Sequence, residues 1–245
     1  MSKTLILIPS RMAASRLPGK PLLKINNLSI ISHVFKKAEK ANIGEVVVAT
    51  EDQEIFDDVL NNGGKAILTS KKHKTGTDRI YEAYKKLNIK NIEFILNLQG
   101  DEPNIDIDDI FNLNNFMIKN SSNIGTLAAE IKDISVKENP NIVKVIIEKK
   151  LTKDNFPLAL NFSRKMPDEK NQNIYHHIGI YSYRVDTLEK FVNFHQTKNE
   201  IDNNLEQLRA LDNKLRINVA LAKTSPIGVD TKEDYIAIKK IMEYK

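Results

Sequence analysis

The sequence predicts an α/β fold built on a doubly wound, mostly parallel sheet, with a small mixed-sheet subdomain in its second half. Three observations predict this class. Short apolar runs alternate with amphipathic stretches of helical spacing. The runs LILI and VVVA are apolar on both faces, as strands of a helix-covered parallel sheet are. The length of 245 residues suits one such domain, and no internal repeat or linker divides it.

The first half supplies the parallel part of the sheet. The predicted strands are Thr4–Ile8, Glu45–Ala49, Ala66–Thr69 and Phe94–Leu98, and the predicted helices are Ile30–Ala41, Gln53–Asn61 and Asp78–Leu87. Crossovers between parallel strands are right-handed, so an open sheet covered by helices is the simplest arrangement. Ligands bind such sheets beyond the carboxyl ends of the strands. The loops that follow the strands are therefore the first place to look for chemistry.

The second half is less regular, because four strand-like runs follow one another without helices between them. These runs are Gly125–Ile131, Val143–Glu148, Leu158–Phe162 and Ile178–Tyr183. They indicate an antiparallel or mixed portion, and we expect residues 120–190 to form a subdomain inserted into a single domain of residues 1–245. The chain then returns to helices at Val185–Phe194, Asn203–Leu211 and Asp234–Tyr244, with a last strand at Ile217–Ala220.

Composition narrows the functional classes. The 37 basic and 32 acidic residues give a net charge of +5, which suits an anionic substrate, although a lysine-rich genome would give the same balance. The basic residues are spread without an aromatic-interleaved cluster, so we expect no nucleic-acid partner. The absence of cysteine excludes disulfides, thiolate metal sites and a cysteine nucleophile. The apolar run in MSKTLILIPSR is too short for a signal peptide or a membrane span, so the cytoplasm is the expected location and no membrane partner is expected.

The loop after the first predicted strand is the most informative segment. It reads IPSRMAASRLPGKPL over residues 8–22 and gathers two arginines, a lysine, two serines and a glycine. Guanidinium groups, an ammonium and loop NH groups are suited to cradling phosphates. The segment is neither a Walker A loop nor GxGxxG, and a solvated loop without function is the alternative. Its position at the expected ligand edge favours anion binding.

This loop resembles the signature of the sugar-activating nucleotidyltransferases. In its full form it is similar to the cytidylyltransferases that activate 3-deoxy-manno-octulosonate (Kdo), the CMP-Kdo synthetases. Six further segments match that family in order along the chain: KTGTDR at 74–79, NLQGDEP at 97–103, NFSR at 161–164, HIGIYSY at 177–183, LEQLR at 205–209 and GVDTKED at 228–234. Together the matches span almost the whole chain, which makes chance a poor explanation.

The resemblance implies a Rossmann-like nucleotide-diphospho-sugar transferase fold and a reaction that joins CTP and Kdo to give CMP-Kdo and pyrophosphate. It also implies Mg²⁺ as cofactor, a homodimer formed through the inserted subdomain, and a step of lipopolysaccharide biosynthesis. One alternative is a cytidylyltransferase for a related acid sugar, such as 8-amino-Kdo or a sialic acid. Another is a silent nucleotide-binding protein that has lost the chemistry, although the chain keeps both aspartates and the lysine of the family motifs.

The resemblance assigns roles residue by residue. The implied catalytic residues are Lys20, Arg11, Arg16, Asp101 and Asp230, of which Asp101 and Asp230 are the implied metal ligands. The implied nucleotide-binding residues are Pro9, Ser10, Arg11, Ser15, Lys20, Thr75, Gly76, Thr77, Arg79, Gln99 and Gly100. The implied sugar-binding residues are Arg164, His177, Tyr183, Glu206 and Gln207.

Each assignment has a structural alternative. Gly100, Asp101 and Pro103 belong to a segment that is also typical of a turn. Asp230 precedes a predicted helix and can cap it, as Thr75 or Thr77 can cap an earlier one.

The acceptor residues have alternatives as well. A keto-acid sugar needs a cation for its carboxylate and hydrogen-bonding groups for its hydroxyls, and the five implied residues supply these types. A histidine before an apolar strand is otherwise more often structural, and Glu206 and Gln207 are unremarkable on a helix surface. Where Asn161 stands the family usually has an aromatic residue, which weakens the assignment of the exact acceptor.

Overall fold

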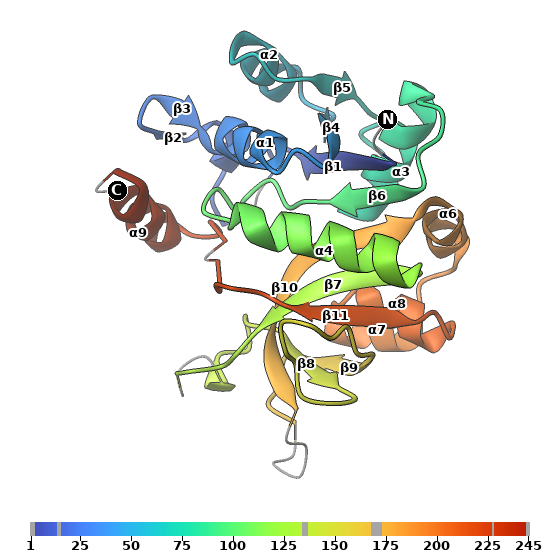
Figure 1. The fold of residues 1–245 in the computed structure, drawn as a ribbon. Helices are drawn as coiled ribbons and strands as arrows, with labels where there is room; N and C mark the ends of the chain where they lie inside the picture. The colour runs from blue at the N-terminus through green and yellow to red at the C-terminus, as the bar shows by residue number, and fades with distance from the viewer. Residues whose placement is uncertain (1–2, 14–15, 134–136, 168–172, 227, 244–245) are drawn as a thin grey trace. The chain divides into compact units, whose positions relative to one another are not determined.

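The computed structural model describes residues 3–13, 16–133, 137–167, 173–226 and 228–243. The chain divides into two compact units (Figure 1). The first comprises Met1–Phe111 and Pro226–Lys245, and the second comprises Asn112–Ser225.

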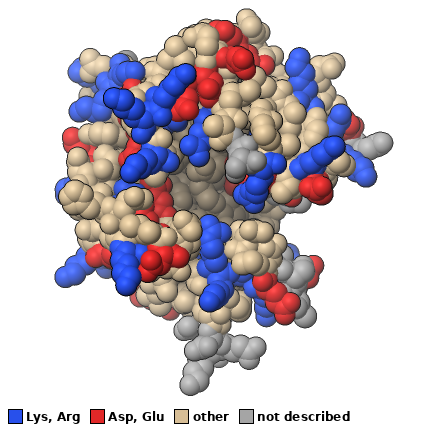
Figure 2. All heavy atoms as spheres, turned by 180° about the vertical axis from the view of Figure 1, so that it is seen from behind, with Lys and Arg blue, Asp and Glu red and all other residues tan. Residues whose placement is uncertain are grey.

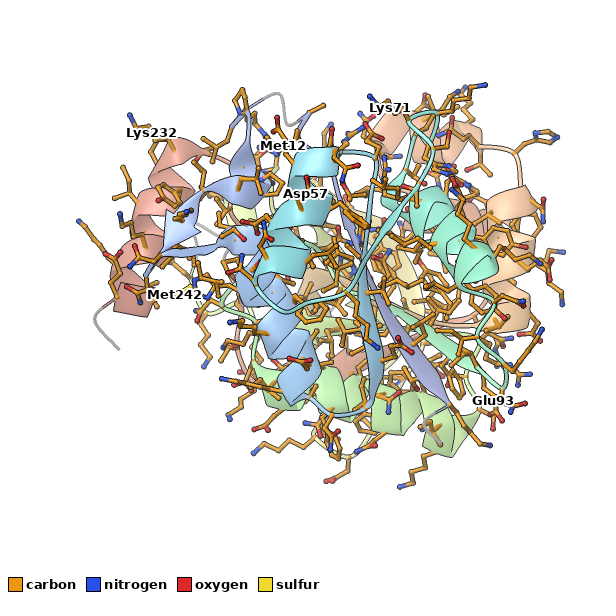
Figure 3. The ribbon with its side chains drawn as sticks, turned by 90° about the horizontal axis from the view of Figure 1, so that it is seen from above. Met12, Asp57, Lys71, Glu93, Lys232 and Met242 are labelled. Atoms are coloured by element: carbon orange, nitrogen blue, oxygen red, sulfur yellow. The ribbon has the colours of Figure 1, made fainter. Side chains whose placement is uncertain are left out.

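Four strands of the first unit pair in parallel, in the order β6, β1, β4, β5. They are β1 (Thr4–Ser10), β4 (Gly44–Thr50), β5 (Ala66–Leu68) and β6 (Phe94–Asn97). The helices packed on them are α1 (Ile30–Lys40), α2 (Gln53–Asn61) and α3 (Gly76–Leu87). Figure 3 shows α1 and α2 on one side of β1 and α3 on the other, so the predicted doubly wound α/β fold is confirmed.

The carboxyl ends of these strands share one edge. Met12 follows β1 and Lys71 follows β5, and Figure 3 places both at one end of the strands, whereas Glu93, which precedes β6, lies at the other. Strand register agrees, because Ser10 at the end of β1 pairs with Thr50 at the end of β4. The loops that carry the basic signature and the NLQGDEP segment therefore emerge at the same edge.

A small hairpin holds the C-terminal helix in the first unit. Strands β2 (Lys24–Ile25) and β3 (Leu28–Ser29) are joined by Asn26 and Asn27, whose φ angles of 47° and 64° suit a tight two-residue turn. A short 3₁₀ helix, η1 (Lys20–Leu22), leads into it. Helix α9 (Lys232–Glu243) buries Ile238 beside Ile25, Ile30 and Val229, and the Tyr235 hydroxyl donates to the Lys24 carbonyl at 2.6 Å. This packing fixes where residues 228–231 lie.

The second unit is a mixed sheet. Strand β10 runs antiparallel to β7 and β8, β9 runs antiparallel to β8, and β11 runs parallel to β7. The strands are β7 (Ile124–Ala129), β8 (Lys144–Ile147), β9 (Ala159–Ser163), β10 (Ile174–Arg184) and β11 (Ile217–Leu221). The helices are α6 (Val185–Asn193), α7 (Lys198–Asn203) and α8 (Gln207–Asp212). The mixed pairing confirms what the four successive strand-like runs predict.

Two helix predictions differ from the structure. Helix α4 (Ile107–Asn120) was not predicted, because its asparagine-rich sequence obscures the apolar spacing. The single helix expected at Asn203–Leu211 is wrong, because Asn204 adopts a left-handed conformation with φ of 51° and ends α7. A new helix begins only at Gln207.

Charged side chains of both signs are interleaved on the face that Figure 2 shows. The expectation that nucleic acid is not a partner remains a prediction. Within the described ranges, no helix combines the length and apolarity needed to cross a bilayer.

Candidate functional site

A pocket of about 440 Å³ lies in the first unit. Its walls come from the loop after β1, the segment between β5 and α3, the turn after β6, and the segment before α9. The lining residues are Pro9, Ser10, Arg11, Ala13, Arg16, Lys20, Pro21, His73, Lys74, Thr75, Gly76, Arg79, Gln99, Gly100, Asp101 and Asp230. All the implied catalytic residues line this one pocket. Of the implied nucleotide-binding residues, Thr77 is buried and outside the lining, and Ser15 lies outside the described residues.

Lys20 joins the two candidate metal-binding aspartates. Its Nζ donates to Asp101 Oδ2 at 2.7 Å and to Asp230 Oδ1 at 3.2 Å. The other oxygen of Asp230, Oδ2, is 2.9 Å from a guanidinium nitrogen of Arg16. Asp101 and Asp230 lie 81 and 210 positions from Lys20 in the sequence. The fold therefore brings two carboxylates from distant segments to one cationic group.

Backbone contacts explain why Asp230 reaches this position. The NH of Val229 donates to the carbonyl of Asp101 at 2.9 Å, which fastens the segment before α9 to the turn after β6. The start of α9 is capped by other residues: Thr231 Oγ1 accepts from the Asp234 NH, and Asp234 Oδ2 accepts from the NH groups of Asp230 and Thr231. The capping alternative for the Asp230 side chain is therefore wrong, and its carboxylate faces Lys20 and Arg16.

The turn at Gly100 and Asp101 requires close backbone approach. A Cβ atom on Gly100 would stand 3.0 Å from the Pro9 carbonyl oxygen and 3.1 Å from Ile31 Cδ1. A larger residue would push this turn away from the end of β1. The turn alternative for the NLQGDEP segment is thus correct for the backbone, and the turn also aims Asp101 at Lys20.

The electrostatics of the cluster keep Lys20 charged. Burial lowers the pKa of Lys20, but the neighbouring carboxylates, Asp101 more than Asp230, outweigh burial and hold that pKa above its usual value. Glu102 behaves in the opposite way. Burial first, and then the negative charges of Asp101 and Asp230, raise the pKa of Glu102 to about 8. Its Oε2 is buried and has no hydrogen-bond partner among the described residues.

The donor set fits a hard divalent cation. Asp101 and Asp230 contribute oxygen donors only, and a third carboxyl oxygen, Glu102 Oε2, is buried close enough to them for their negative charges to add to the effect of burial and raise the pKa of Glu102. Mg²⁺ prefers oxygen ligands and usually shares its shell with substrate phosphates, so two carboxylates suffice. In the described part of the chain, no group of three or more His, Asp or Glu residues is arranged as a complete metal site. The carboxylate pair can hold Mg²⁺ only with a ligand that completes its shell.

The segment before α3 forms another wall. The Thr75 hydroxyl accepts from the Asp78 NH at 3.1 Å, so Thr75 is the N-cap of α3 while it lines the pocket. The sequence offers two roles for Arg79, contact with a phosphate or capping of its own helix. Capping is wrong, because Thr75 is the N-cap and the Arg79 guanidinium pairs with Glu51 and donates to Thr69 Oγ1 at 2.7 Å. Arg79 still borders the pocket, and its contact with a nucleotide stays a prediction.

No role was predicted for four pocket-lining residues, Ala13, Pro21, His73 and Lys74. Ala13 and Pro21 belong to the basic loop and Lys74 begins the KTGTDR segment, whereas His73 follows two exposed lysines and no pattern distinguished it. Neither Lys74 nor Arg11 belongs to an ion pair within the ranges that the structure describes. These two cations can therefore bind an anionic ligand without first breaking an internal pair.

The implied sugar-binding residues lie in the second unit. His177 and Tyr183 are buried in β10, and Glu206 and Gln207 stand at the start of α8. Tyr181 lies between the two β10 residues, with its ring 5.4 Å from that of His177 and 5.8 Å from that of Tyr183, and its pKa responds to the charge of Glu206. His177, Tyr183 and Glu206 therefore lie around Tyr181, and Gln207 follows Glu206 in the sequence.

Arg164, the fifth, is committed to backbone carbonyls. Its Nε donates to Asn203 at 3.1 Å and a terminal nitrogen donates to Asn204 at 3.1 Å. These residues directly precede Leu205 and Glu206, so Arg164 fastens the start of α8. Its contact with a sugar carboxylate stays a prediction.

His177 is held neutral. Burial, and secondarily the charge of His176, lower the pKa of His177 to about 3. Its Nε2 is 3.0 Å from Thr126 Oγ1, whose own proton is directed to the Ile180 carbonyl at 2.7 Å. Thr126 therefore accepts from His177, which leaves Nδ1 of the imidazole as a hydrogen-bond acceptor.

Comparison with known proteins decides the family. The family model described as "Cytidylyltransferase" matches residues 5–217. A 3-deoxy-manno-octulosonate cytidylyltransferase of Afipia carboxidovorans is 43% identical over 240 residues, covering 98% of this chain and 96% of that protein. The chain belongs to the 3-deoxy-manno-octulosonate cytidylyltransferase family. The enzyme of the same name from Rhodopseudomonas palustris is 42% identical and covers 99% of both chains.

Solved structures agree with this family. A CMP:2-keto-3-deoxy-manno-octonic acid synthetase, solved in complex with CTP, superimposes with a TM-score of 0.88 at 35% identity and covers 99% of each chain. A UDP-glucose pyrophosphorylase, 14% identical, shares the fold with a TM-score of 0.71. The resemblance inferred from seven sequence segments and the Rossmann-like nucleotidyltransferase fold are both confirmed.

Proposed function

We propose that this chain transfers the cytidylyl group of CTP to Kdo, releasing CMP-Kdo and pyrophosphate. The observation that carries the proposal is the convergence of Lys20, Asp101 and Asp230 in a pocket that Arg11 and Arg16 also line. The substrates in the proposal are those named for the related Kdo cytidylyltransferases.

The chemistry is an in-line displacement. The anomeric hydroxyl oxygen of Kdo forms a bond to the α-phosphorus of CTP, the bond to the pyrophosphate oxygen breaks, and the hydroxyl proton is released to solvent. No covalent enzyme intermediate is needed, so positioning and charge neutralisation carry the catalysis. Arg11, Arg16 and Lys20 are placed to neutralise the departing pyrophosphate. Pro9, Ser10, Gln99 and Gly100 line the remaining wall as candidate base and ribose contacts.

Asp101 and Asp230 are the proposed holders of Mg²⁺, which when bound polarises the phosphate and acidifies the attacking hydroxyl. Lys20 neutralises these carboxylates in the free protein. When a triphosphate enters, the same ammonium can turn to the phosphates, because an anionic ligand competes for it. The carboxylates are then available to the cation.

The proposed acceptor site is in the second unit. His177 Nδ1, Glu206 and Gln207 supply acceptors and donors for sugar hydroxyls, Tyr183 supplies a ring face, and Arg164 supplies a cation near the start of α8. These roles rest on the family resemblance and on the clustering around Tyr181.

Pyrophosphate release tests the function directly. Purified protein with CTP, Mg²⁺ and Kdo is expected to release one pyrophosphate per CMP-Kdo formed, with little release when Kdo is omitted. Competition between Kdo and 8-amino-Kdo in one assay identifies the preferred acceptor. Release that is equally fast with no sugar, or none with any acid sugar, contradicts the proposal.

We also propose that the chain is a homodimer formed through the subdomain of residues 120–190. Leu160 in β9 supports it, because this large apolar residue is 59% exposed on a strand of the subdomain. Sedimentation is expected to give twice the chain mass, and Leu160→Asp is expected to shift the protein toward one chain mass. A monomer at micromolar concentration contradicts this proposal.

A further inference from the structure

Two side chains of α3, Arg79 and Glu82, hold the segment that connects β5 to α3. They lie three positions apart and thus on one face of the helix. Arg79 donates to Thr69 Oγ1 at 2.7 Å and to the Ser70 carbonyl at 3.4 Å. The carboxylate of Glu82 accepts from the Ser70 NH, at 3.0 and 3.2 Å to its two oxygens, and is in contact with His73 Nε2. We call this arrangement the α3 clamp.

The α3 clamp fixes a wall of the nucleotide pocket. The held segment continues directly into His73, Lys74, Thr75 and Gly76, all four of which line the pocket. At its other end Thr75 is fixed by the N-cap hydrogen bond to the Asp78 NH. A short connection fastened at both ends has few conformations left, so its binding groups are ordered before a ligand arrives. Preordering of this kind strengthens binding, because less conformational entropy is lost on association.

Glu82 is the member of the clamp that touches both the backbone and a pocket-lining side chain. Its side chain is 21% exposed, and it also pairs with Lys86 at 2.6 Å on the solvent side. Burial raises the pKa of Glu82, but hydrogen bonds from Lys86, His73 and the Ser70 NH outweigh it and bring that pKa to about 2. Glu82 therefore stays ionised at neutral pH, and its contacts are charge-assisted, which makes them stronger than neutral hydrogen bonds.

We propose that Glu82 is a positioning residue for the nucleotide, which acts by orienting His73 and the backbone of residues 70–73 so that the pocket wall is preformed. This positioning role rests on the proposed function only because it takes CTP as the ligand. Glu82 does not line the pocket itself. Its loss should therefore weaken nucleotide binding without slowing the bond-forming step.

Calorimetric titration with CTP, without any acceptor, tests this proposal. Glu82→Gln removes the charge and one acceptor oxygen, and we expect its Kd for CTP to rise about tenfold, which corresponds to about 1.4 kcal/mol. Lys86→Met is the matched control, because it removes a half-exposed partner of the same carboxylate that does not line the pocket, and its Kd should stay within about twofold. In turnover assays Glu82→Gln should raise KM for CTP, with kcat and the KM for Kdo nearly unchanged.

The outcomes separate this proposal from the proposed function. An unmodified protein that fails to bind CTP contradicts the function itself, whereas equal CTP affinity in Glu82→Gln and the unmodified protein overturns only the positioning role. A fall in kcat with an unchanged KM for CTP also overturns it. Should Glu82→Gln fail to fold, His73→Gln breaks the same contact from the pocket side. That variant should raise the Kd for CTP about three- to tenfold, and an unchanged Kd would again overturn the proposal.

Discussion

The two units handle buried charge in different ways. In the first, Lys20 pairs with Asp101 and Asp230 in a cluster that solvent reaches, with side-chain exposures of 13%, 31% and 47%. In the second, the ion pair between Glu200 and Arg209 is 5% and 4% exposed and is enclosed by helices α7 and α8. The first cluster can exchange its internal partners for a ligand. The second has no such freedom, because water cannot replace a lost partner.

Histidine chemistry shows the same contrast. His73 in the first unit lines an open pocket and contacts a carboxylate, whereas His177 in the second is kept neutral by burial. The difference teaches that the nucleotide pocket is built from paired charged side chains, whereas the aromatic cluster around Tyr181 keeps its histidine neutral by burial.

The largest expected effect is on stability in the second unit. Glu200→Gln removes the carboxylate that is hydrogen-bonded to the buried Arg209 guanidinium, and leaves Glu206, 3.7 Å away, as the remaining acidic partner. We expect the free energy of unfolding to fall by about 3–5 kcal/mol in urea denaturation. Lys65→Met, which breaks the exposed Lys65–Glu45 pair, is the control and should cost less than about 1 kcal/mol. Similar losses for the two variants would remove the contrast between buried and exposed pairs.

The next effect is on turnover in the first unit. Asp101→Ala and Asp230→Ala are each expected to fold normally and to lose about 10²- to 10³-fold in the rate of pyrophosphate release, by analogy with the loss of other electrostatic contacts in active sites. Asp57→Ala is a suitable control, since that exposed carboxylate on α2 accepts a hydrogen bond from Gln53 at 2.7 Å and does not line the pocket (Figure 3). Near-normal turnover in either pocket variant would contradict the metal-holding role.

A third expected effect is a pH dependence that originates in the second unit. His177 is neutral when folded down to about pH 3, whereas the unfolded chain binds its proton near pH 6.5. Its stabilising contribution is therefore present above pH 6.5 and is lost as pH falls from 6.5 toward 3, at up to about 1.4 kcal/mol per pH unit. His176, whose pKa burial and the charge of Lys144 also lower, adds to the same trend.

The His177→Gln variant isolates the contribution of His177 to the pH dependence of the free energy of unfolding. In denaturation curves between pH 7 and pH 5, the unmodified chain should lose more stability, or gain less, than the variant. Glu102, whose raised pKa of about 8 stabilises the folded protein as pH falls over this range, acts in the opposite direction but equally in both proteins. Glu82 does not interfere, because its contribution is lost only below the unfolded pKa of about 4.5. Parallel curves for the two proteins would mean that His177 is not held neutral by burial.

The smallest expected effect separates capping from ligand binding at α9. Thr231→Ala removes the hydroxyl that accepts from the Asp234 NH and should lower stability by about 1 kcal/mol. The same substitution should leave turnover far less affected than Asp230→Ala does. Thermal unfolding and pyrophosphate release measured on both variants check this. A larger stability loss from Asp230→Ala than from Thr231→Ala would restore the capping role to Asp230.

Much of the fold could be predicted because parallel strands are buried on both faces. The strand at Thr4–Ile8 and the helix at Gln53–Asn61 appear where the apolar pattern places them. Helix α4 escaped prediction because asparagines at its exposed positions are typical of turns. The break at Asn204 escaped because a single left-handed residue leaves no trace in the apolar spacing.

The sequence by itself determined the fold class, the order of the motif segments and the family, since each depends on local pattern or on residue identity in order. Only the tertiary structure decided which groups meet. Asp101 and Asp230 converge on Lys20 because α9 packs on the β2–β3 hairpin and Val229 bonds to the Asp101 backbone. The contacts of Arg79 with Glu51 and of Glu82 with His73 likewise depend on how α3 packs against its neighbours. Contacts between segments far apart in the chain depend on packing, and packing has no periodicity that a sequence displays.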